Sequence, residues 1–476
     1  MTWKEFRTIQ TRRRFLDLCA GGIGTTALAQ LLAAEGRLPE VNPLAPKPQH
    51  FPAKAKRLIY LFMEGAPSQV DLFDPKPELA KWDGKPLPES LTKDIKLAFI
   101  KPTAAIMASQ REFKRHGQSG AELSDWLPHT AQVADDLCFI RSMHTEAFNH
   151  HPAQLFLMSG SMQMGRPTLG SWLLYGLGSE SQNLPGFIVL GSKANATMAG
   201  STNWTCGFLP STYQGVHFRD ADEPIVYLKN PQGLSRERQR AALNAMRDLN
   251  AENYQRTGDI EIASRVASYE LAFRMQAAAP ELLDFSGESE KTLEAYGIGK
   301  EPMHGFGSNC LMARRLVERG VRSVMIIHTS WDDHKHLNQN LKLNCDITDQ
   351  PTAALMRDLK QRGLLEDTLV VWGGEFGRTP MGEIQRPEEA DSAGRDHLPD
   401  AFTIWMAGAG VKTGQTVGKT DDLGLRVVED PVHVHDLQAT ILHFMGLDHT
   451  KLTYRHMGRD FRLTDVAGEV VGKVLG

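Results

Sequence analysis

The sequence has no long hydrophobic run and no excess of positive charge. A membrane-spanning helix needs about 20 consecutive apolar residues. The sequence of 476 residues contains no such run. The formal net charge is −4, whereas nucleic-acid binding normally requires a basic patch. With 41% hydrophobic and 23% charged residues, the composition indicates a globular protein with one large or two medium domains. We therefore expect no nucleic-acid partner and no stable transmembrane segment.

Cysteine is also scarce. The chain has five cysteines, at Cys19, Cys138, Cys206, Cys310 and Cys345, and no two of them form a CxxC pair. A zinc site built from thiolates is therefore not expected. One or two disulfides stay open, because the spacing of the cysteines does not pair them.

Two common catalytic signatures are missing as well. The sequence contains no Gly-x-Ser-x-Gly elbow of the kind used by serine hydrolases. The segment Gly408-Ala409-Gly410 falls short of a dinucleotide fingerprint, since no acidic residue is suitably placed after a following strand.

The N-terminal segment, residues 1–36, carries an export pattern. Thr11-Arg12-Arg13-Arg14-Phe15-Leu16-Asp17 resembles a twin-arginine signal, and a weakly apolar stretch over 18–34 follows it. Ala27-Leu28-Ala29 offers a cleavage site of small residues. The alternative is a basic amphipathic helix. Export through the twin-arginine machinery predicts a periplasmic or extracellular protein, and the proline-rich residues 37–56 then form a linker.

The rest of the chain alternates between short apolar runs and helical periodicity. Strands are expected at Arg57–Met63, Leu137–Ile140, Pro185–Leu190, Val321–His328, Leu369–Trp372 and Phe402–Met406. Helices are expected at Pro152–Ser159, Asn309–Glu318, Thr352–Arg362 (entered by Pro351) and Asp436–Phe444. This alternation predicts an α/β domain over residues 57–462, with a mainly parallel sheet and helices on both faces. Residues 81–128 are expected to be irregular, residues 230–300 to form a helical insertion or cap, and residues 463–476 a C-terminal tail.

Polar residues lie next to three of the expected strands. Glu375 comes after Leu369–Trp372 and two glycines, and Asp332, His334 and His336 come after Val321–His328. His397 lies in Gly394-Arg395-Asp396-His397, which precedes another strand. Ligands in open α/β sheets bind at the carboxyl ends of the strands. Carboxylates and imidazoles there predict a divalent-metal site in which Asp332 pairs with His334 or His336. The alternative is a solvated polar loop.

A second cluster precedes the expected helix Pro152–Ser159. Asn149, His150 and His151 lie at its start, where free N–H groups and the helix dipole favour an anion such as phosphate or sulfate. Asn149 or an imidazole capping the helix is an equally good interpretation.

Four further residues are candidates for the same site. Glu64 ends the first strand and is a possible extra ligand, and Ser68 and Asp71 follow it in a polar turn that has an ordinary structural explanation. Arg141 is a candidate for neutralising the oxygens of a bound ester, as is Arg378.

Several motifs occur together in one order. They are the twin-arginine signal and the segments at 65–74 (Gly-Ala-Pro-Ser-Gln-x-Asp-Leu-Phe-Asp), 141–150 (Arg-Ser-Met-His-Thr-Glu-Ala-Phe-Asn-His), 331–334 (Trp-Asp-x-His), 375–379 (Glu-Phe-Gly-Arg-Thr) and 394–397 (Gly-Arg-Asp-His). From about residue 11 to 470 the chain resembles a family of exported, uncharacterised bacterial proteins often labelled sulfatases. That family is similar to the alkaline phosphatase–sulfatase superfamily.

The resemblance implies an alkaline-phosphatase-like fold and metal ligands at Asp332, His334 or His336, Glu375 and His397. It also puts His150 where sulfatases carry a cysteine-derived nucleophile. The chain departs from the superfamily there, and it has Phe376 where a histidine ligand is usual. The usual covalent route through an oxygen nucleophile is therefore not available at residue 150.

Two functions follow. The first is an exported metal-dependent hydrolase of sulfate or phosphate esters, such as a sulfated or phosphorylated saccharide, with His150, His151, Asn149 and Arg378 at the reacting group. His150 would act as nucleophile or general base. The second is a non-catalytic exported binding or surface-assembly protein that keeps the fold.

The cofactor would be Zn²⁺, Mn²⁺, Fe, Ca²⁺ or Mg²⁺. Metal identity, substrate, turnover and oligomeric state do not follow from the sequence.

Overall fold

The computed structural model describes residues 42–92, 95–191, 198–219, 224–226, 228–383 and 392–476. Within these ranges the core is a nine-stranded sheet in the order β12-β4-β11-β8-β1-β7-β5-β6, with β15 also paired to β4. Its strands are β1 (Arg57–Met63), β4 (Cys138–His144), β5 (Phe187–Gly191), β6 (Val216–Phe218), β7 (Ser323–His328), β8 (Thr368–Gly373), β11 (Phe402–Ala407), β12 (Gln415–Val417) and β15 (Val432–His433).

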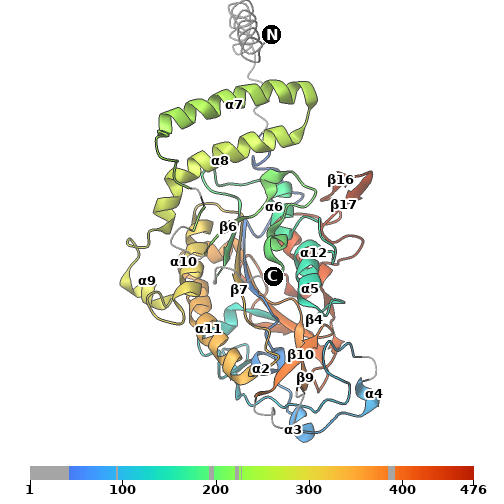
Figure 1. The fold of residues 1–476 in the computed structure, drawn as a ribbon. Helices are drawn as coiled ribbons and strands as arrows, with labels where there is room; N and C mark the ends of the chain where they lie inside the picture. Colours follow the sequence, from blue (N-terminus) through green and yellow to red (C-terminus); the bar gives the residue numbers. More distant parts are fainter. Residues whose placement is uncertain (1–41, 93–94, 192–197, 220–223, 227, 384–391) are drawn as a thin grey trace, which may run out of the picture. The chain divides into compact units, whose positions relative to one another are not determined.

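The sheet is mainly parallel. The neighbours β8, β1, β7, β5 and β6 all run the same way. Only β11 is antiparallel to its partners β4 and β8. The predicted α/β fold with a mainly parallel sheet is confirmed (Figure 1).

Both faces of the sheet are buried. Along β1, Ile59 and Leu61 belong to one apolar cluster, while Tyr60 and Phe62 belong to another. This alternation follows from the two-residue period of a strand. Helices α10 (His304–Glu318) and α11 (Leu337–Gln361) pack on the first face, and α5 (His150–Ser159), α6 (Leu169–Leu177) and α12 (Val434–Phe444) on the second. A strand covered on both faces reads as one continuous apolar run, as the sequence of β1 does.

Several element boundaries differ from the prediction. Helix α11 runs through Pro351 instead of starting after it, because the helix is already established and its Leu341, Leu355 and Leu359 are buried in the core. Strand β4 continues to His144 and α5 begins at His150. Residues 81–128 contain short helices and the hairpin β2 (Phe113–His116) and β3 (Ala121–Ser124), where the sequence has no sustained periodicity.

A two-stranded sheet beside the main one was not predicted. It consists of β9 (Gly377–Glu383) and β10 (Gly394–Leu398), which pair antiparallel. The register sets His397 opposite Arg378 and shifts between Arg395 and His397. A bulge of this kind re-aims side chains locally. His397 and Arg395 therefore serve different contacts, described below.

Residues 230–300 contain the helices α7 (Arg236–Thr257), α8 (Ile260–Leu283) and α9 (Glu290–Ala295). Helix α7 has no buried residue and pairs with α8, as Figure 1 shows. No helix in the part of the chain that the structure describes is long and apolar enough to cross a membrane.

The ends of the domain are tied to its core. Residues 43–56, assigned to a linker from the sequence, hydrogen-bond to it, for example from Lys54 N to Phe444 O. In the predicted tail, Val474 is fully buried. Cys138, Cys206, Cys310 and Cys345 are buried and unpaired. The predicted twin-arginine segment and Cys19 lie outside the described residues.

Candidate metal centre

Three neighbouring strands deliver the acidic residues of the site. Strands β8, β1 and β7 lie side by side and parallel, so Glu375, Glu64 and Asp332 leave the sheet at the same edge. Gly65 turns the chain after β1 with φ +109°, and a Cβ there would lie 2.6 Å from the main-chain nitrogen of Asp332. Glycine at this position lets the two loops approach each other.

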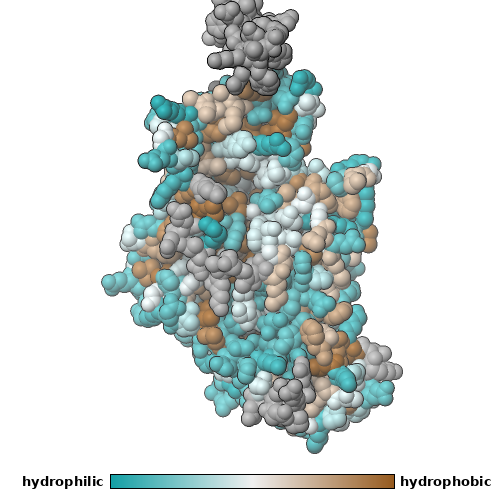
Figure 2. Space-filling view, viewed as in Figure 1, coloured by the Kyte–Doolittle hydropathy of each residue, from teal (hydrophilic) through white to brown (hydrophobic). Residues whose placement is uncertain are grey.

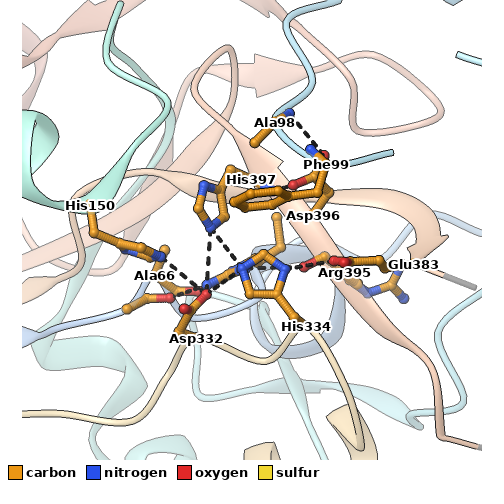
Figure 3. Close-up of polar contacts among 12 residues, drawn as sticks. Ala66, Ala98, Phe99, His150, Asp332, His334, Glu383, Arg395, Asp396 and His397 are labelled. Carbon is orange, nitrogen blue, oxygen red and sulfur yellow. Dashed lines mark hydrogen bonds and ion pairs between the residues drawn. The ribbon is translucent and has the colours of Figure 1, made fainter. Parts of the chain in front are cut away.

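Four side chains converge at this edge (Figure 3). Ligand atoms of His150, Asp332, His334 and His397 all lie within 4.8 Å of one another. Asp332 Oδ1 is 3.0 Å from His150 Nε2, 2.8 Å from His334 Nε2 and 3.5 Å from His397 Nε2. The Nε2 atoms of His334 and His397 are 3.0 Å apart. We call these four residues the HHHD cluster.

Each imidazole of the HHHD cluster is oriented by an acceptor on its other nitrogen. Nδ1 of His150 donates to Glu375 Oε1 at 2.6 Å, and Nδ1 of His334 donates to Glu383 Oε2 at 2.6 Å. Nδ1 of His397 donates to the carbonyl of Phe148 at 2.6 Å. A neutral imidazole that donates from Nδ1 has its lone pair on Nε2. All three Nε2 atoms therefore face one another and Asp332 as potential ligands.

The HHHD cluster fits a divalent cation. His150 Nε2 is buried and makes no aligned hydrogen bond, and two imidazole lone pairs at 3.0 Å repel unless a proton or a cation lies between them. Metal-bound histidines typically donate their second N–H to a carboxylate or a carbonyl, as all three do here. Three nitrogens and one carboxylate oxygen suit Zn²⁺, Mn²⁺ or Fe better than Ca²⁺ or Mg²⁺, which prefer oxygen.

Opposite effects of burial and charge set the pKa values in the cluster. Burial lowers the pKa of His334, but the carboxylates of Asp332 and Glu383 outweigh this and raise it to about 9. The same competition raises the pKa of His150 beside Asp332 and Glu375. Burial leaves the pKa of His397 below its ordinary value. Although burial opposes it, contacts with the three imidazoles and Arg378 hold the pKa of Asp332 far below its usual range.

Glu375 and Glu64 lie behind His150. The carboxylate of Glu375 is fully buried and accepts from the main-chain N–H of Gly65, from Gln154 and from His150. It therefore contacts His150 and is not part of the HHHD cluster, because its turn directs it towards Gly65. Burial and the nearby charge of Glu375 raise the pKa of Glu64 to about 7. Glu64 Oε1 accepts from the N–H of Met198, and Oε2 is buried without a hydrogen bond.

Two arginines form a buried frame under the site. Arg378 is fully buried and donates to the carbonyls of Gly65 and Ala66 and, at 2.6 Å, to Asp332. Its N–H groups hold the turn after β1 and contact Asp332, and the contact of Arg378 with substrate oxygens stays a prediction. Arg395 donates to both oxygens of Asp71.

The remaining candidates, Ser68 and Asp71 in the polar turn and Arg141 on β4, make contacts within the folded chain. Ser68 Oγ donates to Asp71, the partner of Arg395. Arg141 lies 3.7 Å from Glu122 and 3.8 Å from Asp74. These contacts explain Ser68, Asp71 and Arg141 as parts of the folded frame.

Three other candidates do not join the HHHD cluster. His336 is the residue directly before α11, in a left-handed conformation (φ 55°), and it is exposed. Asn149 precedes α5 and makes no side-chain capping hydrogen bond, so the capping interpretation fails for Asn149. His151 Nε2 is buried without a hydrogen-bond partner.

Four further residues near the cluster were not predicted as site residues from the sequence: Glu383, Asp396, Gln154 and Phe99. Glu383 orients His334 and ends β9, a strand that was not predicted. Asp396 stands directly before His397 in the quoted Gly-Arg-Asp-His motif, which was the one available signal. Gln154 is one turn after His150 on α5, and it accepts from Asn203 while donating to Glu375.

The fold and the HHHD cluster define an α/β protein with a candidate metal centre at the carboxyl edge of a mainly parallel sheet. The chain belongs to the family described as "Protein of unknown function (DUF1501)", whose model matches residues 55–475. No curated protein matches the chain.

Some solved structures share its fold at low identity. One is an alkaline phosphatase from the Antarctic bacterium TAB5, 11% identical with a TM-score of 0.30, covering 82% of this chain and 98% of that one. Another is the PsFucS1 sulfatase from Pseudoalteromonas sp., 12% identical with a TM-score of 0.36, covering 83% and 68%. A third is the lipoteichoic acid synthase LtaP from Listeria monocytogenes, 9% identical with a TM-score of 0.31, covering 89% and 79%. All three TM-scores lie below 0.5, so this likeness carries no argument about function.

Proposed function

We propose that the chain is an exported, metal-dependent hydrolase of phosphate or sulfate esters. The observation behind this proposal is the HHHD cluster, in which three imidazole Nε2 atoms and one carboxylate oxygen face a common point and each Nδ1 is already hydrogen-bonded. The side chains of Asp332, His334 and His150 are 26%, 24% and 12% exposed, so the cluster is in contact with solvent. The ester class comes from the motif resemblance described above.

The cluster residues would hold the ion, preferably Zn²⁺ or Mn²⁺. When bound, such an ion supplies Lewis-acid polarisation of an ester oxygen and lowers the pKa of water. Glu375 and Gln154 fix the orientation of His150, and Glu383 fixes that of His334. Glu64, with its pKa raised to about 7, can hold or release a proton near neutral pH.

One observation favours the alternative of a non-catalytic exported protein with a structural metal. His150 Nε2 lies among the other donors and completes a set of four. Structural zinc sites are closed by four protein ligands, whereas catalytic sites keep one position open. The two functions therefore differ in whether His150 stays on the metal.

Metal content and hydrolysis measured together test the proposal. The purified mature protein should contain about one transition metal per chain and hydrolyse p-nitrophenyl phosphate or p-nitrophenyl sulfate. His397→Ala should lose both properties. His443→Ala, on α12, where the ring packs against Phe51, should keep both.

The possible results separate the two functions. Stoichiometric metal without hydrolysis of either ester would favour the structural-metal alternative. Absence of stoichiometric metal from the parent protein and from both variants would remove the main support for the hydrolase.

A further inference from the structure

Phe99 is an exposed aromatic residue that stands against the metal centre. Its side chain is 64% exposed, yet its ring contacts two cluster histidines edge-to-face. The centroid distances are 5.1 Å to His334 and 5.5 Å to His397. Figure 3 shows Phe99 beside both rings, with His150 on the other side of His397.

The chain around Phe99 is anchored, so its exposure is not that of a loose loop. Ile95 is buried, and Leu97 and Ile100 pack against the same apolar cluster, which includes Met381 and Leu398. Phe99 does not belong to that cluster. Leaving a phenyl ring in water forgoes the stabilisation that burial would give. The ring lies against two cluster histidines, so its exposed surface is available to a ligand bound at the HHHD cluster.

Asp396 fixes the position of the Phe99 main chain. Its Oδ2 accepts from three successive main-chain N–H groups, those of Ala98 and Phe99 at 2.9 Å and of Ile100 at 3.2 Å. Its Oδ1 accepts from the N–H of His397 at 2.8 Å. One carboxylate therefore joins the Phe99 segment to the residue that supplies a cluster imidazole. The ring is held in place relative to the site.

Further apolar surface lies nearby. Phe148, whose carbonyl orients His397, is 41% exposed. Figure 2 shows hydrophobic residues at the surface over β9 and β10, the hairpin that carries His397. An anion bound at the HHHD cluster would thus have an aromatic wall on the side of His334 and His397.

We propose that Phe99 is a specificity-determining residue and that the natural ligand carries an apolar group, an aromatic ring in particular, next to its anionic group. This inference rests on the proposed function and deepens it by naming the organic part of the ester. The HHHD cluster takes the anionic end, and Phe99 contacts the ring, since aromatic pairs prefer offset or edge-to-face contacts. Asp396 is the positioning residue.

Binding of two matched non-hydrolysable anions tests this without relying on turnover. The Kd values of phenylphosphonate and methylphosphonate are measured by calorimetry on the Zn²⁺-loaded protein, the parent and its variants. The parent should bind phenylphosphonate more tightly. Phe99→Ala should weaken phenylphosphonate by roughly three- to tenfold, the size of one aromatic contact, and leave methylphosphonate and Zn²⁺ affinity unchanged. Leu249→Ala removes a 69% exposed apolar side chain from α7. It should leave the affinities for phenylphosphonate, methylphosphonate and Zn²⁺ unchanged.

The outcomes distinguish this inference from the proposed function. If both phosphonates bind but the parent shows no preference, or Phe99→Ala leaves the preference intact, the role of Phe99 is wrong and the hydrolase proposal stands. If neither phosphonate binds the Zn²⁺-loaded parent, both are wrong. If Phe99→Ala does not fold, Phe99→Leu is measured in its place. It keeps an apolar side chain without the ring, and we expect it to prefer phenylphosphonate over methylphosphonate less strongly than the parent does.

Discussion

Glu383 shows how a residue outside the HHHD cluster can control it. Its carboxylate accepts from His334 Nδ1 at 2.6 Å and so aims His334 Nε2 at Asp332. Outer hydrogen-bond partners of metal-bound histidines typically change metal affinity by 10–100-fold.

We therefore expect Glu383→Gln to weaken Zn²⁺ binding by about 10–100-fold, because an amide is a weaker acceptor for the imidazole N–H. Competition with a chromophoric chelator measures this. Glu252→Gln, on the exposed surface of α7, is the control and should bind Zn²⁺ like the parent. Equal affinities for all three proteins would contradict the orienting role of Glu383.

The buried pair Asp71–Arg395 makes a second prediction at the residue scale. Burial raises the pKa of Asp71, but the guanidinium of Arg395, 2.7 Å away, outweighs this and holds the pKa below its ordinary value. A carboxyl with a lowered folded-state pKa stabilises the fold above its unfolded pKa of about 4. That stabilisation is lost as the pH falls through the folded-state pKa.

Asp71→Asn should reduce the free energy of unfolding at pH 7 by about 3–5 kcal/mol, because it leaves Arg395 buried without its charge partner. It should also make the free energy of unfolding less dependent on pH below about pH 4. Urea unfolding at several pH values measures both effects. Asp248→Asn, at a side chain 70% exposed, should leave the curve unchanged. If Asp71→Asn shows the same pH dependence of the free energy of unfolding below pH 4 as the parent, this explanation is refuted.

At the scale of elements, the packing after α5 depends on one glycine. Gly160 ends the helix in the left-handed region (φ 68°), and a Cβ there would overlap the main-chain oxygen of Leu463. Gly258 ends α7 in nearly the same conformation (φ 66°), but nothing lies within 4 Å of an added Cβ. A comparison of substitutions at these two glycines separates the free-energy cost of the left-handed conformation from the cost of the contact with Leu463.

Gly258→Ala should cost about 1–2 kcal/mol, the penalty of the left-handed conformation. Gly160→Ala should cost about 1–3 kcal/mol more, because the residue 463 segment must move. Thermal and urea unfolding compare the two variants. Similar losses in both would mean that the contact with Leu463 contributes nothing.

At the scale of the whole molecule, we propose that the chain is exported after folding. Twin-arginine export carries folded proteins, which suits a protein whose four candidate metal donors come from three segments far apart in sequence. Arg12→Lys together with Arg13→Lys should leave the precursor in the cytoplasm, measured by fractionation and immunoblotting. Paired replacement of Arg236 and Arg238, at the exposed start of α7, is the control. An unchanged periplasmic yield in the signal variant would contradict the export proposal.

The sequence determined most of the core. The buried runs around Arg57–Met63 and Leu369–Trp372 predicted strands because only continuous apolar residues suit a sheet covered on both faces. The strand order then followed from packing, which places β1 between β7 and β8. The sequence also located Asp332, His334 and His397 as candidate ligands, since each lies next to an apolar run and is chemically suited to metal.

The tertiary structure alone decided how these residues meet. Glu383 and His334 are 49 residues apart, and no local periodicity encodes a contact made across an unpredicted hairpin. The contacts of His334 with Asp332, Glu383 and His397 place it in the cluster, whereas His336, two residues later, is exposed. The residue types of Arg378 and Glu375 suggested a substrate contact and a metal ligand. In the structure both are buried, and they hydrogen-bond to Asp332 and His150, respectively. Residue type and spacing limit which chemistry is available, whereas the direction of each side chain is set by long-range packing that the sequence pattern does not contain.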